Sequence, residues 1–457
     1  MFPPGARLSK PLSHATGSRV SAEVMIGEGK RLEPHPLRAA VLGEVHARPF
    51  TAIEIPRRIL HFAFETAGER GEADRAALVD FCNRRGLVAP KPGDKHHRLA
   101  FSGSILRWEQ HSEFTTYTWE LASERVDAGT APFHPAASAL ASAMALLPQP
   151  GPLLVAIDLH LIANGPELFA PERVFERSSL TMAEVADSGA VIASDFQCDP
   201  AGFIRILMID RGLDPERAGA TVQRLLELET YRTLALLGLP EAQRLAPSVN
   251  RIERHLGELT EQMRRTEGLS ANHKLLDELT ALAAELEAGA TASLFRFGAS
   301  RAYDEIVQLR LQTLGERPVK GLPTWSSFLA RRMAPAMRTC VTLEARQANL
   351  STKLARAANL LRTRVDVELE RQNRDLLESM NERTRLQLLL QATVEGLSVA
   401  AISYYVVGLF GYVAKAVAEA GVPFNPGYAM AAFVPFAVAV IWWIVRRIRK
   451  RHIASAK

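Results

Sequence analysis

Two apolar segments near the carboxyl end constrain this sequence more than any other feature. The first runs from residue 396 to 414 and the second from residue 427 to 445, and neither contains a charged side chain. A helix needs about 20 apolar residues to cross the hydrocarbon core of a bilayer. Both segments therefore predict transmembrane helices. The alternative, a buried helical hairpin in a soluble domain, fits their length and lack of charge less well.

Basic residues beside these segments predict their orientation. Arg446 and Arg447 directly follow the second segment and begin a basic tail, and Arg383 and Arg385 precede the first. Cationic flanks stay on the cytoplasmic side of a membrane. We therefore expect a transmembrane hairpin over residues 394–457 with both termini in the cytoplasm. The basic tail either signals this topology or also contacts anionic lipid head groups.

The first apolar segment also carries polar and small residues that admit two interpretations. They are Glu395, Ser398, Ser403, Tyr404, Gly408, Gly411 and Tyr412. As the lining of a pore, they would face water along one stripe of the helix, with Glu395 at the inner mouth. As packing residues, they would let helices approach closely in the bilayer.

The region from residue 213 to 393 has the pattern of a helical, coiled-coil stalk. Asp214-Pro215-Glu216 is a strong helix start, because it joins a capping carboxylate to proline at the first helical position. Further helices are expected near residues 249–263, 275–286 and 300–314. A proline-free stretch follows from residue 336, and apolar residues from Leu350 onward recur with an eleven-residue period. Such a stripe needs partners, so we predict a homo-oligomer joined through this helix.

The preceding residues predict an α+β cytoplasmic domain over 35–212, after a mobile tail at 1–34. Strands are expected at 58–66 and 153–163, and an amphipathic helix at 72–86. Residues 97–110 and 113–121 are rich in aromatic and β-branched side chains and predict a hairpin around residue 111. Further strands are expected within 183–197 and at 202–210. The expected sheet is mostly antiparallel.

Two polar clusters in this domain are candidate sites. Glu44, His46 and Arg48 alternate in "EVHARPF", so on a strand they would share one face. They would either bind an anion or catalyse acid–base chemistry. The alternatives are that they form the solvent-exposed face of an edge strand or a buried ion pair before a turn at Pro49. Asp158 and His160 share a face of the 153–163 strand. They are the candidate metal ligands, with His96, His97 or His111 as a possible third ligand, and the alternative is that they satisfy partners within the fold.

Composition limits the classes of function. The net charge is only +5, and outside the carboxyl end no basic stripe is interleaved with aromatic residues, so we expect no nucleic-acid partner. The three cysteines are far apart, which fits a reducing compartment. The sequence has no phosphate-binding, dinucleotide-binding, serine-hydrolase or zinc-protease motif. We therefore expect no enzyme activity, with an enzyme in the N-terminal domain as a lesser alternative, and no cofactor other than a divalent cation if the protein is a CorA-like channel.

The stretches "HPLRAAVLGEVHARPF" and "RVDVELERQNRDLLESMNERTRLQLLLQATVEGLSVAAISYYVVGLFGY", together with the double apolar segment, resemble a bacterial family of uncharacterised membrane-anchored proteins with a domain of unknown function. The resemblance spans residues 35–451, and "VEGLSVAAISYYVVGL" is its most specific part. It implies a protein of the bacterial inner membrane and brings no activity.

The layout is also similar to that of CorA-type magnesium channels. These have a cytoplasmic α/β domain and a long helix that enters the membrane and lines a pore between five subunits. Their Gly-Met-Asn motif is replaced here by Gly411-Tyr412-Val413. Two functions therefore remain as expectations. The first is a membrane-anchored protein whose cytoplasmic domain binds an unidentified partner or serves as a scaffold. The alternative is an oligomeric channel or transporter for divalent cations.

Overall fold

The computed structural model describes residues 24–26, 30–38, 41–42, 50–123, 132–164, 171–319, 321–420, 423 and 425–455. Its larger sheet has nine strands in the order β11-β8-β9-β10-β7-β3-β6-β5-β4. The strands are β3 (Arg57–Glu65), β4 (His96–Phe101), β5 (Ser104–Gln110), β6 (Phe114–Ala122), β7 (Leu153–Ala163), β8 (Thr181–Val185), β9 (Ala190–Ser194), β10 (Ile204–Asp210) and β11 (Arg317–Pro318). A separate antiparallel pair, β1 (Val24–Ile26) and β2 (Lys30–Leu32), lies within the segment predicted as a tail.

The sheet is mixed, which corrects the expectation of a mostly antiparallel one. Among the described strands, β10 and β7 pair in parallel, and the other pairs are antiparallel. The predicted strand at 97–110 is in fact two strands, because Ser102 and Gly103 take positive φ angles of 51° and 76° and turn the chain between β4 and β5. Asn, Gly and other small polar residues tolerate this left-handed conformation best.

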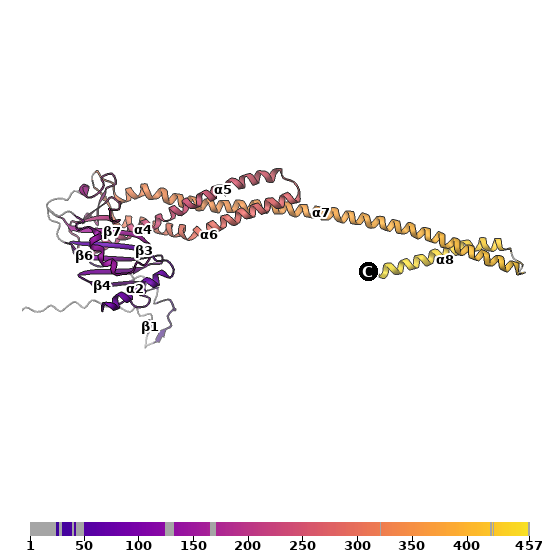
Figure 1. Ribbon diagram of the computed structural model, residues 1–457, viewed down its shortest axis with the longest axis horizontal. Helices are drawn as coiled ribbons and strands as arrows, with labels where there is room; N and C mark the ends of the chain where they lie inside the picture. The colour runs from indigo at the N-terminus through magenta and orange to yellow at the C-terminus, as the bar shows by residue number, and fades with distance from the viewer. Residues whose placement is uncertain are drawn as a thin grey trace, which may run out of the picture. The chain divides into compact units, whose positions relative to one another are not determined.

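Helices cover both faces of the sheet (Figure 1), so most side chains of its central strands are buried on both sides. The helical elements are α2 (Arg70–Arg84), α3 (Ala137–Leu140), η1 (Ala141–Leu146), η2 (Pro171–Arg173), α4 (Pro215–Leu236), α5 (Gly238–Arg265), α6 (Leu269–Leu314), α7 (Trp325–Glu419) and α8 (Pro426–Ser455). One core joins β3 and β7 to α4, the end of α6 and the start of α7. A second core joins the opposite face to α2.

Local sequence explains where these helices begin. Asp214 caps α4 by accepting a hydrogen bond from the backbone N–H of Arg217 at 2.8 Å. Gly219 lets α4 approach the preceding segment, since a Cβ at this position would lie 1.9 Å from the carbonyl oxygen of Thr51.

The two helices expected near 275–286 and 300–314 form one continuous helix, α6. Gly289 and Gly298 lie within it without ending it.

Contacts divide the chain into two units. Unit 1 comprises residues 1–255 and 282–353, and unit 2 comprises residues 256–281 and 354–457.

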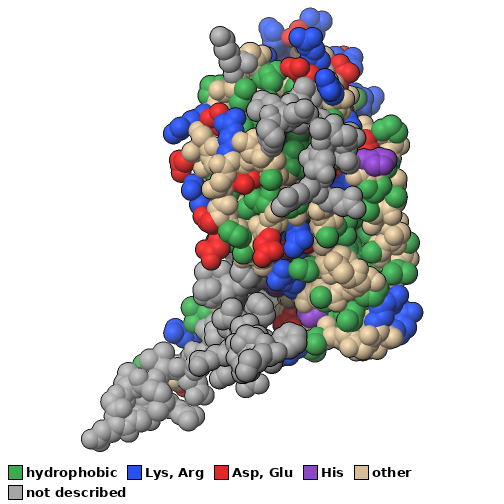
Figure 2. Space-filling view, turned by 90° about the vertical axis from the view of Figure 1, so that its left-hand side faces the viewer, with side chains coloured by type: hydrophobic (Ala, Val, Ile, Leu, Met, Phe, Trp, Pro, Cys, Tyr) green, Lys and Arg blue, Asp and Glu red, His purple; other side chains and the backbone are tan. Residues whose placement is uncertain are grey.

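On the face of the molecule shown in Figure 2, Lys and Arg side chains are interspersed with Asp and Glu. All three cysteines are free, with Cys198 exposed and Cys82 and Cys340 buried.

In each unit α5, α6 and α7 pack as a helical bundle. In unit 1, polar contacts join the helices in pairs: Arg251 with Glu285, Arg346 with Glu253, and Arg301 with Glu344. In unit 2 the buried leucine and valine side chains come from all three helices: Leu256, Leu259, Leu275, Leu279, Leu354, Leu361 and Val365. The predicted stripe on α7 is therefore partly correct, because it is buried as far as Val365.

Beyond Val365 the same stripe is exposed. Leu369, Leu376 and Met380 continue the eleven-residue pattern and are 39%, 60% and 56% exposed. Helices α5 and α6 have no residues left to cover them, since α5 ends at Arg265 and α6 begins at Leu269. Within the described chain, α7 thus carries an apolar stripe without a partner.

Candidate functional site

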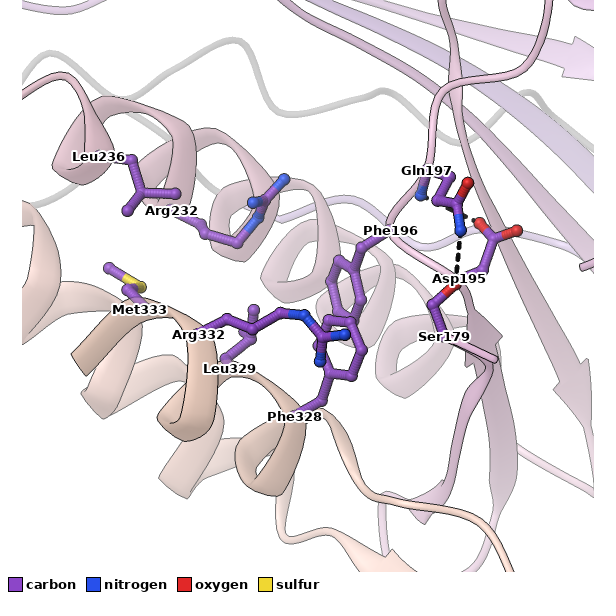
Figure 3. Close-up of a pocket in the computed structure, with 10 residues that line it drawn as sticks. All are labelled: Ser179, Asp195, Phe196, Gln197, Arg232, Leu236, Phe328, Leu329, Arg332 and Met333. Carbon is purple, nitrogen blue, oxygen red and sulfur yellow. Dashed lines mark hydrogen bonds between the residues drawn. The ribbon is translucent and has the colours of Figure 1, made fainter. Parts of the chain in front are cut away.

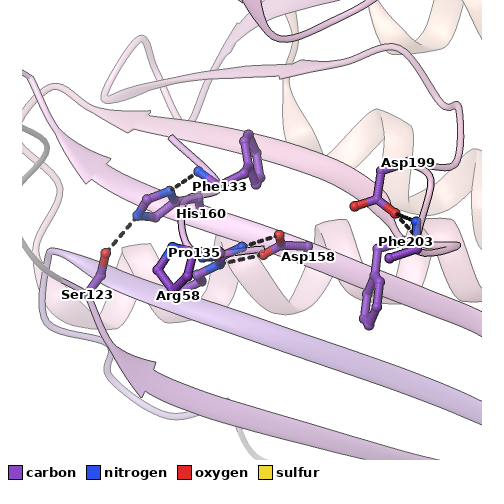
Figure 4. A network of polar contacts seen from close by, with 9 residues as sticks. Arg58, Ser123, Phe133, Pro135, Asp158, His160, Asp199 and Phe203 are labelled. Atoms are coloured by element: carbon purple, nitrogen blue, oxygen red, sulfur yellow. Dashed lines mark hydrogen bonds and ion pairs between the residues drawn. The ribbon is translucent and has the colours of Figure 1, made fainter. Parts of the chain in front are cut away.

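The two polar residues of the 153–163 strand lie in a buried network with β3 (Figure 4). The Arg58 guanidinium donates to both carboxylate oxygens of Asp158, from Nε at 2.8 Å and from Nη2 at 2.5 Å. Its Nη1 donates to the carbonyl oxygen of Pro135 at 2.6 Å. Both charged side chains are almost wholly buried. A buried ion pair is tolerated when its geometry is good and its other donors are satisfied, as they are here.

His160 is held in a neutral form beside this ion pair. The backbone N–H of Phe133 donates to Nδ1 at 3.2 Å, so the ring proton is on Nε2, which lies 2.7 Å from the Ser123 hydroxyl. Burial, and then the charge of Arg58, lower the pKa of His160 to about 4. A metal ion bound by Asp158 would have to displace Arg58.

The possible third metal ligands lie elsewhere. His96 and His97 are on β4, which is separated from β7 by β3, β6 and β5. His111 stacks on Phe114 instead. Across the described part of the chain, no three His, Cys, Asp or Glu side chains are grouped so that they could hold a metal. Glu44, His46 and Arg48 lie outside the described residues.

A pocket of about 240 Å³ lies where the β9–β10 connection meets α4 and α7 (Figure 3). The Phe196 and Phe328 rings stack with centroids 5.0 Å apart, and the Arg332 guanidinium lies 3.9 Å from the Phe328 centroid. Arg232 lies over Phe196 and is ion-paired with the buried Glu229. Because these cations already have partners, we interpret the pocket as a packed junction between the helices and the sheet.

A second cavity, of about 230 Å³, lies between the sheet and helices α4 and α6. We call it the Arg107 cavity. It is lined by His61, Arg107, Glu109, His111, Phe114, Thr116, Gln223, Leu226, Glu227, Thr230, Tyr231 and Arg310. His61, Thr118 and Arg107 are neighbours across strands β3, β6 and β5, so they point to the same face of the sheet.

His61 is neutral in this cavity. Its two ring nitrogens lie 2.8 Å from the Thr118 hydroxyl and 3.1 Å from the Thr230 hydroxyl. Burial, followed by the charges of Arg107 and His111, lowers the pKa of His61 to about 3. It therefore contributes hydrogen bonds to the cavity wall and no charge at neutral pH.

Apart from His111, which the sequence suggests as a possible metal ligand, sequence reasoning missed the residues of the Arg107 cavity. Arg107 and Glu109 alternate within an aromatic strand, and Gln223 and Arg310 come from helices more than 100 residues further along the chain. The one available signal was a pair of opposite charges on one face of an otherwise apolar strand. Nothing in the sequence indicates that α4 and α6 would leave a cavity above it.

The apolar helices pack against each other in unit 2 through small and aromatic residues. The Phe410 and Phe433 rings stack at 3.9 Å, and Gly411 faces the Met430 side chain. Ser403, on the same helix, is buried. Gly408 has open space where a Cβ would lie. Among the predicted pore or packing residues, Gly411 thus lies at a helix contact and Ser403 is buried.

Most other members of that set are exposed. Tyr404 and Tyr412 are each 78% exposed, Ser398 is exposed and Glu395 is half-buried. Both apolar helices are long and apolar enough to cross a membrane, and only 11% and 6% of the residues in their most apolar windows are buried.

The family model described as "Protein of unknown function (DUF3422)" matches residues 33–452. The chain belongs to the DUF3422 family. This range agrees closely with the 35–451 expected from the sequence and includes the sheet, the bundle and both apolar helices. No curated protein matches this DUF3422 chain. The family description carries no activity, so the function must be argued from the geometry.

Proposed function

We propose that this DUF3422 protein is anchored in the bacterial inner membrane by the end of α7 and by α8, with a cytoplasmic domain that binds a partner or ligand. The observation that carries the proposal is the exposure of both apolar helices. Leu397, Ile402, Val406, Leu409 and Val413 are all exposed on one of them. Fully burying one such side chain is worth ~1.5–3 kcal/mol. Because these five are between 36% and 75% exposed, their exposure to water forfeits roughly 4–8 kcal/mol in total. That is a large fraction of the ~5–15 kcal/mol net stability of a typical domain.

The orientation with both termini in the cytoplasm is part of this proposal. Arg446 and Arg447 follow the apolar part of α8, and Arg383 and Arg385 precede that of α7. The short connection between the two helices would lie outside. A positive charge on each cytoplasmic flank favours this arrangement over its inverse.

A labelling experiment tests anchoring and orientation together. Washed membranes should retain the protein after alkaline carbonate extraction. Exposed Cys198 should react with a membrane-impermeant maleimide in inside-out vesicles and stay unreacted in intact spheroplasts. Ala418→Cys, on a Cys198→Ser background, should show the opposite pattern. Recovery of the intact chain in the soluble fraction would refute the anchor, and equal labelling from both sides in sealed vesicles would refute the orientation.

We propose further that the occupant of the exposed α7 stripe is a second copy of the same chain. The stripe from Leu369 to Met380 continues the one that α5 and α6 bury as far as Val365, with the same eleven-residue spacing. An eleven-residue repeat favours association of nearly straight helices. Identical chains, anchored in one membrane, present this stripe at the same height.

Light scattering in mild detergent tests the self-association. The unaltered protein should have the mass of a dimer or higher oligomer, and Leu376→Glu with Met380→Glu should lower it to that of a monomer. Leu377→Glu places a charge on a neighbouring exposed leucine outside the stripe and should keep the oligomer. A monomeric unaltered protein would overturn the proposal.

A CorA-like cation channel is the second candidate. The observation that favours it is the continuity of α7, a single helix from Trp325 to Glu419 that includes the first apolar segment. In an oligomer, the exposed Tyr404 and Tyr412 side chains would face lipid or a central path. Protein reconstituted in vesicles should then carry divalent cations, with a CorA protein as the positive control. No flux above empty vesicles, while the control conducts, would exclude this candidate and leave the anchor intact.

A further inference from the structure

Arg107 is a buried cation with an incomplete set of partners. Its side chain lies on the wall of the Arg107 cavity and is only 5% exposed. Among the described residues, no acceptor lies within hydrogen-bonding distance of its Nε atom. The closest carboxylate oxygen, on Glu109, is 3.8 Å away. Because a buried guanidinium normally has hydrogen-bonded acceptors, this one is suited to an anionic group of a ligand.

The second cation of the cavity is already satisfied. Arg310 donates from Nε to Glu227 at 2.5 Å, and Glu227 also accepts a hydrogen bond from Gln223 Nε2 at 2.8 Å. Arg107 is therefore the guanidinium left to bind a ligand. Leaving the two histidines aside, the formal charges of Arg107, Arg310, Glu109 and Glu227 sum to zero. A ligand that enters this cavity should itself carry no net charge.

The cavity also contains an acceptor that needs a donor. Since the Nε2 atom of Gln223 donates to Glu227, its Oε1 atom points away from that carboxylate. Oε1 is buried and finds no hydrogen-bond donor within the described structure. Together with the negative charge of Glu109, it forms a position suited to an ammonium group. Phe114 and Leu226 provide an apolar wall beside these polar groups.

We propose that the Arg107 cavity binds a free α-amino acid with a small apolar side chain. The carboxylate would accept from Arg107, the ammonium would donate to Gln223 Oε1 and Glu109, and the side chain would lie on Phe114 and Leu226. The volume of about 230 Å³ equals the share of roughly seven or eight liquid waters at ~30 Å³ each, which is enough room for such a molecule. This inference goes beyond the proposed membrane anchor and does not depend on it.

The test is calorimetric titration of the full chain in detergent with L-leucine, L-valine and L-methionine, up to about 10 mM so that millimolar affinities are detected. At least one should bind saturably. Leucinamide lacks the carboxylate and 4-methylpentanoate lacks the ammonium, so each should bind at least about tenfold more weakly than leucine if both charged contacts are made.

Matched variants locate the binding. Arg107→Met should reduce leucine affinity to that of leucinamide, and Gln223→Leu should weaken leucine while leaving 4-methylpentanoate unchanged. Arg98→Met is the control, since Arg98 is the cross-strand neighbour of Arg107 on β4 and does not line the cavity. It should leave leucine affinity unchanged.

Three results would overturn the proposal. The first is that none of the three amino acids binds. The second is that Arg107→Met leaves the affinity for leucine unchanged. The third is that 4-methylpentanoate binds as tightly as leucine, which would indicate a simple anion site. If Arg107→Met fails to fold, the two analogues on the unaltered protein still decide. Membrane fractionation reports on the anchor separately, so failure of one proposal is distinguishable from failure of the other.

Discussion

Two buried histidines should make the protein sensitive to mild acid. His61 and His160 stay neutral in the fold, with pKa values lowered from 6.5 to about 3 and about 4, mainly by burial. In the unfolded chain both rings take up protons near their ordinary pKa. Each histidine therefore contributes stability that is present above about pH 6.5 and is lost as the pH falls toward the folded-state value.

The size of the loss follows from the difference in proton uptake. At about pH 5 the unfolded ring is protonated and the folded ring is not, and 1.5 pH units at ~1.36 kcal/mol per unit give about 2 kcal/mol for each histidine. The two rings lie on opposite faces of the sheet, so their contributions should add to about 4 kcal/mol. His61→Gln and His160→Gln should each reduce the loss between about pH 8 and pH 5 by about 2 kcal/mol.

Urea unfolding of the full chain in detergent measures this effect. Tryptophan fluorescence is a suitable signal, because Trp108, Trp119 and Trp325 are buried in unit 1. His273 is exposed on α6, so His273→Gln should leave the pH dependence unchanged. Comparison of each variant with the unaltered protein removes the contribution of carboxylates that titrate in the same range. An unchanged pH dependence in the His61→Gln, His160→Gln double variant would refute the reasoning.

Three further predictions concern single contacts. Asp158→Asn should destabilise unit 1 by about 3–5 kcal/mol in urea unfolding, because it leaves the Arg58 charge buried without its carboxylate. The double variant Arg58→Met, Asp158→Leu should lose less stability, because it removes both charges. Equal losses of stability in the single and the double variant would contradict this reasoning. Tyr117→Phe removes a 2.6 Å hydrogen bond to buried Asp74 and should lower the free energy of unfolding by about 1.5–3 kcal/mol. Tyr428→Phe changes an exposed tyrosine and should leave the free energy of unfolding unchanged. Gly219→Ala should lower the free energy of unfolding by about 1–3 kcal/mol, since its methyl group would meet the Thr51 carbonyl. Gly257→Ala has open space around it and should raise that free energy by up to about 1 kcal/mol. A higher melting temperature for Gly219→Ala than for Gly257→Ala would refute the close approach of Gly219 to Thr51.

Local patterns in the sequence predicted several elements well. The continuous apolar run of residues 153–163 became β7, and the Asp214-Pro215 start became the capped end of α4. Both depend on neighbouring residues alone. The eleven-residue stripe likewise predicted one long helix, and α7 contains it.

Other features depend on contacts between distant segments, and the sequence could not supply them. The sequence predicts Ser102 and Gly103 to be part of a strand, because apolar residues flank them on both sides. The parallel pairing of β10 with β7 depends on where the intervening β8–β9 hairpin docks. The Arg107 cavity joins β5 to α4 and α6 across about 200 residues. The predicted Glu44, His46 and Arg48 cluster falls outside the described residues and stays a prediction.

The composition of the core of unit 1 has a consequence for biosynthesis. The larger core takes in Leu314 at the end of α6 and the Trp325 and Phe328 side chains at the start of α7. The strands made early by the ribosome therefore cannot complete their packing until translation has passed residue 328. The first apolar segment follows from residue 396. In a chain anchored as proposed, folding of this part of the protein and membrane insertion of the nascent chain would therefore overlap in time.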